Sequence, residues 1–172
     1  MIVYIHSHEM IDTGRTFGRH SGVPPTDIRH IVVPLGTDVN GIIALVQAQV
    51  TNPRSIWLLI FNGHGDDSGT GAFLIGQWIE PSSMHNFRPL SELMNGFGYG
   101  VEVHCCRSSK TSVQELARAF QTRVIGSVND QVGLVYLRGT EIIDPVGGDR
   151  YGLIEGIWVA AYPDGRVYRI DR

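Results

Sequence analysis

The chain has 172 residues, 42% of them apolar and 18% charged, which suits one globular domain over residues 1–172 and is short for two. Its 14 Lys and Arg against 17 Asp and Glu give a formal net charge of -3 without a basic run, so nucleic acid is not an expected partner. No apolar stretch approaches the roughly 18 to 20 residues that span a bilayer, and no signal-peptide pattern opens the chain. We therefore expect a cytoplasmic protein that does not enter a membrane.

The first third of the chain predicts three strands and a helix. Ile2 to His6 and His30 to Leu35 are short apolar runs, and Pro34 favours a sheet edge for the second because it lacks a backbone donor. From Val39 to Val50 the apolar residues recur with helical spacing. Ile56 to Phe61 is apolar without alternation, which is typical of a strand covered on both faces, and we expect it at the sheet centre.

The remaining elements continue this alternation of strands and helices. We expect a hairpin or lid at Gly69 to Ile79, a short helix at Pro89 to Met94 and a strand at Val101 to Cys105. A helix at Ser112 to Phe120, a strand at Val124 to Val128 and a terminal hairpin at Ala160 to Ile170 follow. Ser112 and Glu115 are spaced as a capping box for the second helix. The order predicts an α/β fold, a three-layer α/β/α sandwich with a mostly parallel central sheet plus small β-hairpins.

Reactive side chains follow two of the predicted strands. His64 stands between two glycines after the apolar run that ends at Phe61, and Cys105 and Cys106, the only cysteines, close the run that begins at Val101. Function in open α/β sheets gathers at the carboxyl ends of the strands. If these strands are neighbours, about 4.8 Å apart, an imidazole from one end can reach a thiol from the other.

Strand alternation separates the two cysteines. Cys105 shares the parity of Val101 and Val103 and is expected to pack in the core, whereas Cys106 falls at the strand end, where a side chain can emerge. A thiol is mostly protonated at neutral pH, so it needs a nearby imidazole or helix N-terminus to act as a nucleophile. We therefore expect Cys106 to be the reactive cysteine, with His64 as its base.

These segments resemble the caspase-like cysteine peptidases, which include caspases, metacaspases, separase, gingipains and bacterial toxin self-processing domains. The caspase signature is Gln-Ala-Cys-Arg-Gly, with its histidine about 50 residues upstream. Here Cys106-Arg107 matches the Cys-Arg pair, Cys105 takes the small-residue position, and His64 lies about 40 residues upstream. The resemblance covers roughly residues 56–131.

The resemblance implies a cysteine endopeptidase that works through an acyl-enzyme. His64 is then the general base and acid, Cys106 the nucleophile, and the amides of Gly65 and Cys106 the oxyanion hole. The implied partner is a protein or peptide substrate, with no cofactor required. An activating partner or oligomer, and export of the protein as an effector, stay open.

The resemblance also suggests a substrate pocket. Ser127 and Asp130 match the separase and metacaspase segment that lines the pocket for the residue before the cut, and an acidic Asp130 would favour a basic residue there. Loop residues before His20 could line the pocket instead. Arg15 or Arg19 would then favour an acidic residue.

Other interpretations follow from the residues that differ from the caspase signature and from neighbouring motifs. His104 and Ser108 replace the Gln and Gly of the signature, which keeps open a catalytically silent protein- or peptide-binding domain of a toxin or immunity system. The glycine-rich residues 65–71 could indicate a nucleotide site, although no helix is predicted to open after them. Zinc is not expected, because adjacent cysteines lack the usual spacer of about two to four residues. The remaining histidines, His104 among them, are expected to be structural or solvated.

Overall fold

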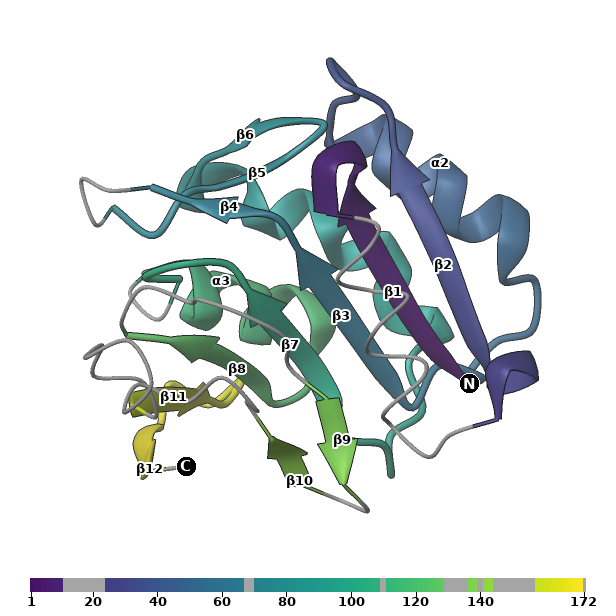
Figure 1. The fold of residues 1–172 in the computed structure, drawn as a ribbon. Coiled ribbons are helices and arrows are strands. Elements are labelled where there is room, and N and C mark those ends of the chain that lie inside the picture. Colours follow the sequence, from purple (N-terminus) through teal and green to yellow (C-terminus); the bar gives the residue numbers. More distant parts are fainter. Residues whose placement is uncertain are drawn as a thin grey trace.

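The computed structural model describes residues 1–10, 24–66, 70–108, 111–128, 136–138, 141–143 and 157–171. Its main sheet has seven strands in the order β12-β11-β8-β7-β3-β1-β2 (Figure 1). The strands are β1 Ile2–Ser7, β2 Ile28–Val33, β3 Leu58–Asn62, β7 Gly100–His104, β8 Val124–Ser127, β11 Ile157–Ala161 and β12 Val167–Asp171. The pairs from β2 to β8 are parallel, and β11 is antiparallel to both β8 and β12. The predicted α/β fold with a mostly parallel sheet is confirmed.

The positions of β2 and β3 in the sheet agree with their sequences. β3 is buried along its whole length between β1 and β7, as expected for an apolar run without alternation. β2 lies at the edge and ends just before Pro34, so the proline follows the strand instead of standing inside it. The predicted bounds of this strand were therefore two residues too late.

Three helices pack on one face of the sheet. They are α2 Val39–Gln49, the 3-10 helix η3 Pro81–Leu93 and α3 Thr111–Phe120, and two short 3-10 turns, η1 His8–Met10 and η2 Pro25–Asp27, flank the first strands. α2 begins after Asp38, whose carboxylate accepts a hydrogen bond from the Gly41 N–H at 2.8 Å. η3 starts eight residues before Pro89, the predicted first residue of this helix. The prediction was too late because a helix with three residues per turn does not show the α-helical spacing.

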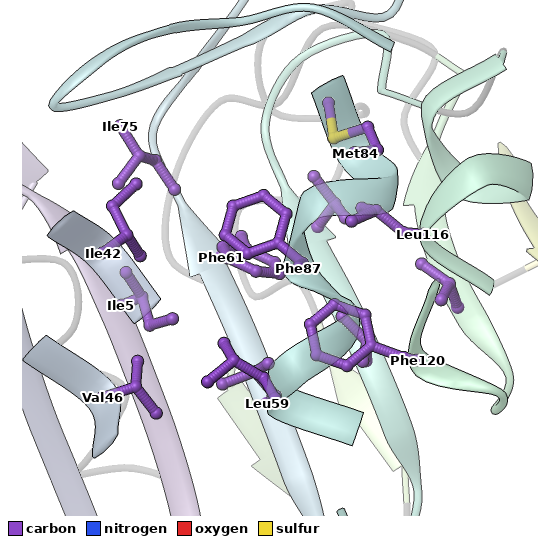
Figure 2. Close-up of a cluster of buried hydrophobic side chains, with 14 of the residues drawn as sticks. Ile5, Ile42, Val46, Leu59, Phe61, Ile75, Met84, Phe87, Leu116 and Phe120 are labelled. Atoms are coloured by element: carbon purple, nitrogen blue, oxygen red, sulfur yellow. The ribbon is translucent and has the colours of Figure 1, made fainter. Parts of the chain in front are cut away.

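The main core lies between these helices and the sheet (Figure 2). Figure 2 shows its side chains from the sheet, from the β5 strand of the small sheet described below and from all three helices: Ile5, Leu59, Phe61, Ile75, Ile42, Val46, Met84, Phe87, Leu116 and Phe120. The Phe61 ring centroid lies 5.1 Å from that of Phe87 and 6.2 Å from that of Phe120. Aromatic contacts at these separations fix how η3 and α3 sit against β3.

The opposite face of the sheet carries no helix in the ranges that the structure describes. Its apolar residues form two smaller clusters. One contains Ile2, Tyr4, Ile28, Leu58 and Ile60, with Trp57 and Tyr99 packed against it, and the other contains Ile125, Trp158 and Ala160. Polar side chains share this face, as described below. Of the predicted sandwich, the described ranges thus show the sheet and one helical layer.

Two smaller sheets accompany the main one. β4 His64–Gly65, β5 Phe73–Ile75 and β6 Gln77–Ile79 form an antiparallel sheet that begins directly after β3. β9 Tyr136–Arg138 and β10 Glu141–Ile143 form an antiparallel pair. The hairpin predicted at residues 69–79 is confirmed for its β5 and β6 strands, and the terminal hairpin is confirmed by the pairing of β11 with β12.

The predicted capping box of α3 is wrong. α3 begins at Thr111, so Ser112 lies inside its first turn, where its buried hydroxyl donates a hydrogen bond to the Gly71 carbonyl at 2.5 Å. This bond ties the start of α3 to the segment that leads into β5. Among the described residues, no helix is long and apolar enough to cross a membrane.

Candidate functional site

The ends of β3 and β7 lie side by side. The two strands pair in parallel, and their last paired residues, Asn62 and His104, face each other across the ladder. His64 and Cys106 each follow two residues later. The expected neighbourhood of the two strand ends is therefore present, and β4 leaves β3 at this edge of the sheet (Figure 1).

Gly65 lies directly against the backbone of Cys106. A Cβ atom on Gly65 would lie 1.7 Å from the Cys106 carbonyl oxygen and 2.7 Å from its nitrogen. Real Cβ atoms do not approach other heavy atoms this closely, so only glycine allows the contact. It brings the two residues of the predicted oxyanion hole together, while that role itself stays a prediction.

Cys105 is a core residue, as the strand parity predicted. Its side chain is fully buried among Val101, Val103 and the helical side chains of the main core. Burial raises the pKa of the Cys105 thiol far above its ordinary value, even though the Gly63 N–H donates a hydrogen bond to the sulfur. A thiol that stays protonated and out of contact with solvent does not act as a nucleophile.

Cys106 occupies a different environment in the turn after β7. Its side chain is half-buried, and the next residue, Arg107, has a left-handed backbone with φ of 52°. A non-glycine residue in this region costs about 1 to 2 kcal/mol, and such residues cluster at functional sites. The turn takes Cys106 out of the strand at the edge where β4 arrives.

Ser108 fixes this turn to the sheet. Its buried hydroxyl donates to the Val103 carbonyl and accepts from the Ser127 N–H, both at 3.2 Å. The loop that carries Cys106 is thus bonded to β7 and to β8. Ser127, a predicted pocket residue, is fully buried at the end of β8, and Asp130 lies outside the described residues together with Arg15 and Arg19.

His64 has a carboxylate partner that sequence patterns did not predict. About half of its side chain is exposed, and its Nε2 lies 3.3 Å from Oε2 of Glu9. Glu9 belongs to η1, which follows β1, the neighbour of β3 on the side away from β7. Three adjacent strand ends therefore supply Glu9, His64 and Cys106. The available signal was the position of Glu9 just past a predicted strand, as for the other two residues.

A buried polar cluster lies on the helix-free face of the same strands. The Tyr4 hydroxyl lies 3.2 Å from Nδ1 of His104, and Nε2 of His104 lies 3.0 Å from Oε2 of Glu102. The His104 ring also meets the edge of Trp158, with ring centroids 5.9 Å apart. His104 is therefore packed and hydrogen-bonded, as predicted, on the sheet face opposite Cys105.

A second part of this cluster runs from β2 to β3. Nε2 of His6 lies 2.9 Å from Nδ1 of His30, and Nδ2 of Asn62 lies 3.3 Å from Nδ1 of His6. Burial, followed by the fields of His30 and His104, lowers the pKa of His6 to about 3, so its ring is neutral near pH 7. His6 and His30 are structural residues, as the sequence led us to expect.

The described residues bear on two alternative kinds of site, a metal site and a nucleotide site. Within these ranges, no group of three or more His, Cys, Asp or Glu is arranged to hold a metal ion. The glycine-rich tract is described only at its ends, where the Asp66 carboxylate accepts a hydrogen bond from the Thr70 hydroxyl at 2.6 Å.

Comparison of the chain with protein-family models, with curated proteins and with solved structures gives no match. The chemistry of the site is therefore argued from its own geometry. That geometry is an exposed imidazole with a carboxylate partner after β3, and a half-buried thiol in a braced turn after the neighbouring β7, with the backbones of Gly65 and Cys106 in contact.

Proposed function

We propose that this protein is a cysteine peptidase of the caspase-like type, with Cys106 as nucleophile and His64 as general base and acid. The observation that carries the proposal is the contact of Gly65 with the Cys106 backbone where β3 and β7 end. This contact holds the residue next to His64 against the residue that bears the thiol. A cysteine nucleophile requires such a neighbour, because the imidazole must take the thiol proton.

The proposed reaction uses the two side chains in turn. His64 takes the proton of the Cys106 thiol, and the sulfur attacks the carbonyl carbon of a peptide bond. The C–N bond then breaks, and the proton on His64 goes to the leaving amine. Water, deprotonated by His64, hydrolyses the resulting thioester and restores the thiol. The amides of Gly65 and Cys106 would donate to the oxyanion formed in each step.

The turn after β7 supports this role for Cys106. Ser108 stands where the caspase signature has glycine, and its hydroxyl bonds to β7 and to β8, so the substitution braces the loop. A rigid loop suits a nucleophile, since catalytic groups must be held in place to react efficiently. The substrate would be a protein or peptide, cut with no cofactor, in the cytoplasm, where thiols stay reduced.

Activity-based labelling tests the proposal. Acyloxymethyl ketones with Arg, Lys, Asp or Leu at the residue before the cut react with an activated thiol, and we expect the basic probes to label the wild-type chain fastest. Cys106→Ala should abolish labelling. His64→Ala should slow it by about 100- to 10,000-fold, the range over which general acid–base groups act. Thermal unfolding should change little in both variants, because neither side chain is fully buried.

Two results would change the conclusion. A folded wild-type chain that no probe labels would favour the silent peptide-binding domain. Preferential labelling by the Asp probe would support a peptidase, but with Arg15 or Arg19 in the substrate pocket and a preference for an acidic residue before the cut.

A further inference from the structure

We propose that Glu9 and Asn62 are positioning residues for His64, with Glu9 holding the imidazole and Asn62 holding Glu9. The proposal rests on the function proposed above. It adds a third strand end to the site, so that Glu9 follows β1, Asn62 and His64 lie at the end of β3, and Cys106 follows β7.

The contact between Glu9 and His64 needs support from elsewhere in the fold. The two side chains are 59% and 50% exposed, and exposed ion pairs are worth only about 0 to 1 kcal/mol. Such a pair does not fix a ring by itself. What matters is how firmly η1 holds the carboxylate next to Nε2 of His64.

Asn62 supplies that support from inside the sheet. Its side chain is 4% exposed at the end of β3, and its Nδ2 lies 3.2 Å from the carbonyl oxygen of Met10, the last residue of η1. The amide therefore donates to the backbone of the turn that carries Glu9. Because Asn62 also precedes His64 by two residues, it connects both ends of the Glu9–His64 contact.

The orientation of the Asn62 amide is fixed in turn by the buried His6 and its partner His30. Its second N–H points to Nδ1 of His6 at 3.3 Å, so that nitrogen must be an acceptor and the His6 proton must sit on Nε2. Nε2 of His6 then donates to Nδ1 of His30 at 2.9 Å. A neutral His6 satisfies this chain of donors and acceptors, and both N–H groups of Asn62 are used.

The expected chemical effect is a choice of tautomer. When the Glu9 carboxylate accepts a hydrogen bond from Nε2–H of His64, the lone pair of the neutral ring lies on Nδ1. That nitrogen is then the one that takes the proton of Cys106. Glu9 touches neither substrate nor sulfur in this scheme, so its loss should slow the reaction without weakening ligand binding.

The test measures the maximal rate and the half-saturating concentration of labelling by the best acyloxymethyl ketone. Glu9→Ala should lower the maximal rate by roughly 10- to 100-fold, as expected for a misplaced catalytic group, with an unchanged half-saturating concentration. Glu9→Gln keeps an acceptor oxygen and should lie between Glu9→Ala and wild type. The matched control is Glu92→Ala, which removes an exposed carboxylate on η3 and should label at the wild-type rate.

Asn62→Ala tests, through a double-mutant cycle, whether Asn62 holds Glu9 in place. If Asn62 acts through Glu9, the double variant Glu9→Ala, Asn62→Ala should be no slower than Glu9→Ala alone. If the fold-loss of labelling rate in the double variant equals the product of the losses in the two single variants, this role of Asn62 is overturned. If thermal unfolding shows that Asn62→Ala does not fold, the Glu9 variants decide the proposal alone.

The outcomes separate this inference from the proposed function. A wild-type chain that labels well while Glu9→Ala labels equally fast would overturn the inference and leave the peptidase intact. A change confined to the half-saturating concentration would also overturn it, since it would show that Glu9 contacts the ligand. A folded wild-type chain that no probe labels would remove both.

Discussion

The strands β1, β3 and β7 carry two sets of polar side chains in different surroundings. Inside the sheet, His6, Asn62 and His104 face each other across the ladder and are at most 5% exposed. Just beyond the strand ends, the side chains of Glu9 and His64 are about half exposed. The two sets are only a few residues apart in the sequence.

The difference shows that position relative to the strand end decides what a histidine or cysteine can do. A buried ring with fixed partners keeps one tautomer and holds neighbouring segments in place. A half-exposed ring at the strand tip is open to proton exchange, which is the role proposed for His64. Cys105 and Cys106 repeat the contrast over a single residue, the first buried in the core and the second half-buried in a turn.

Apart from the loss of the Cys106 or His64 side chain itself, the largest expected effect comes from separating the two strand tips. Gly65→Ala places a methyl group 1.7 Å from the Cys106 carbonyl oxygen, so the β4 backbone must move away from the turn. We expect the labelling rate to fall by about 10- to 100-fold and the free energy of unfolding to fall by about 1 to 3 kcal/mol. Probe kinetics and denaturant unfolding measure the two quantities.

Gly96→Ala is the matched control for this prediction. Nothing lies within 4 Å of a Cβ built on Gly96, so the same chemical change should leave rate and stability close to wild type. Equal behaviour of Gly65→Ala and Gly96→Ala would show that the contact with Cys106 does not matter for the site.

A smaller effect should come from the buried cysteine. Cys105→Ser puts a hydroxyl into a fully buried, mostly apolar environment, which should lower the free energy of unfolding by about 1 to 3 kcal/mol. Labelling should continue, because the proposed nucleophile, Cys106, is unchanged. Denaturant unfolding combined with probe labelling checks both points, and a stable variant that no longer labels would reverse the roles of the two cysteines.

The effect that is smallest near neutral pH, and grows as the pH falls, should appear as a dependence of stability on pH. Because the pKa of His6 is about 3 in the folded protein and near 6.5 in an unfolded chain, the unfolded state binds the extra proton between these values. Stability should therefore fall as the pH drops below about 6.5, by up to about 1.4 kcal/mol per pH unit from this residue.

Replacing His6 isolates that contribution. Denaturant unfolding at several pH values should give a shallower loss of stability for His6→Gln than for wild type. His85→Gln, which removes an exposed histidine, should keep the wild-type slope. Parallel slopes for wild type and His6→Gln would mean that His6 is not held neutral by the buried cluster.

Much of the fold, the burial of Cys105 and the position of the strand ends at the candidate site could be predicted from local patterns. The uninterrupted apolar run of β3 indicated a buried interior strand, and the parity of β7 assigned Cys105 to the core. The apolar run and the strand alternation each extend over a few neighbouring residues, so the sequence of one segment is enough to predict them. The neighbouring positions of the two strand ends that precede His64 and Cys106 followed from the rule that parallel strands end at one sheet edge.

Other features depend on contacts between distant segments. Glu9 lies in a three-residue turn without any periodic pattern, and the carbonyl that Ser112 binds belongs to Gly71, 41 residues earlier. Ser112 looked like a cap because its spacing to Glu115 fits one, but burial against another loop determined its hydrogen bond. The histidine cluster was also missed as a unit, since its members come from β1, β2 and β7.

Mapping the labelled residue by tandem mass spectrometry tests whether Cys106 is the nucleophile and His64 its base. The wild-type chain is treated with the best acyloxymethyl ketone, and the modified peptide that contains both cysteines is fragmented between them. We expect one adduct on Cys106 in the wild-type chain and a strongly reduced yield of the same adduct in His64→Ala. An adduct on Cys105, or equal labelling of both variants, would contradict this expectation.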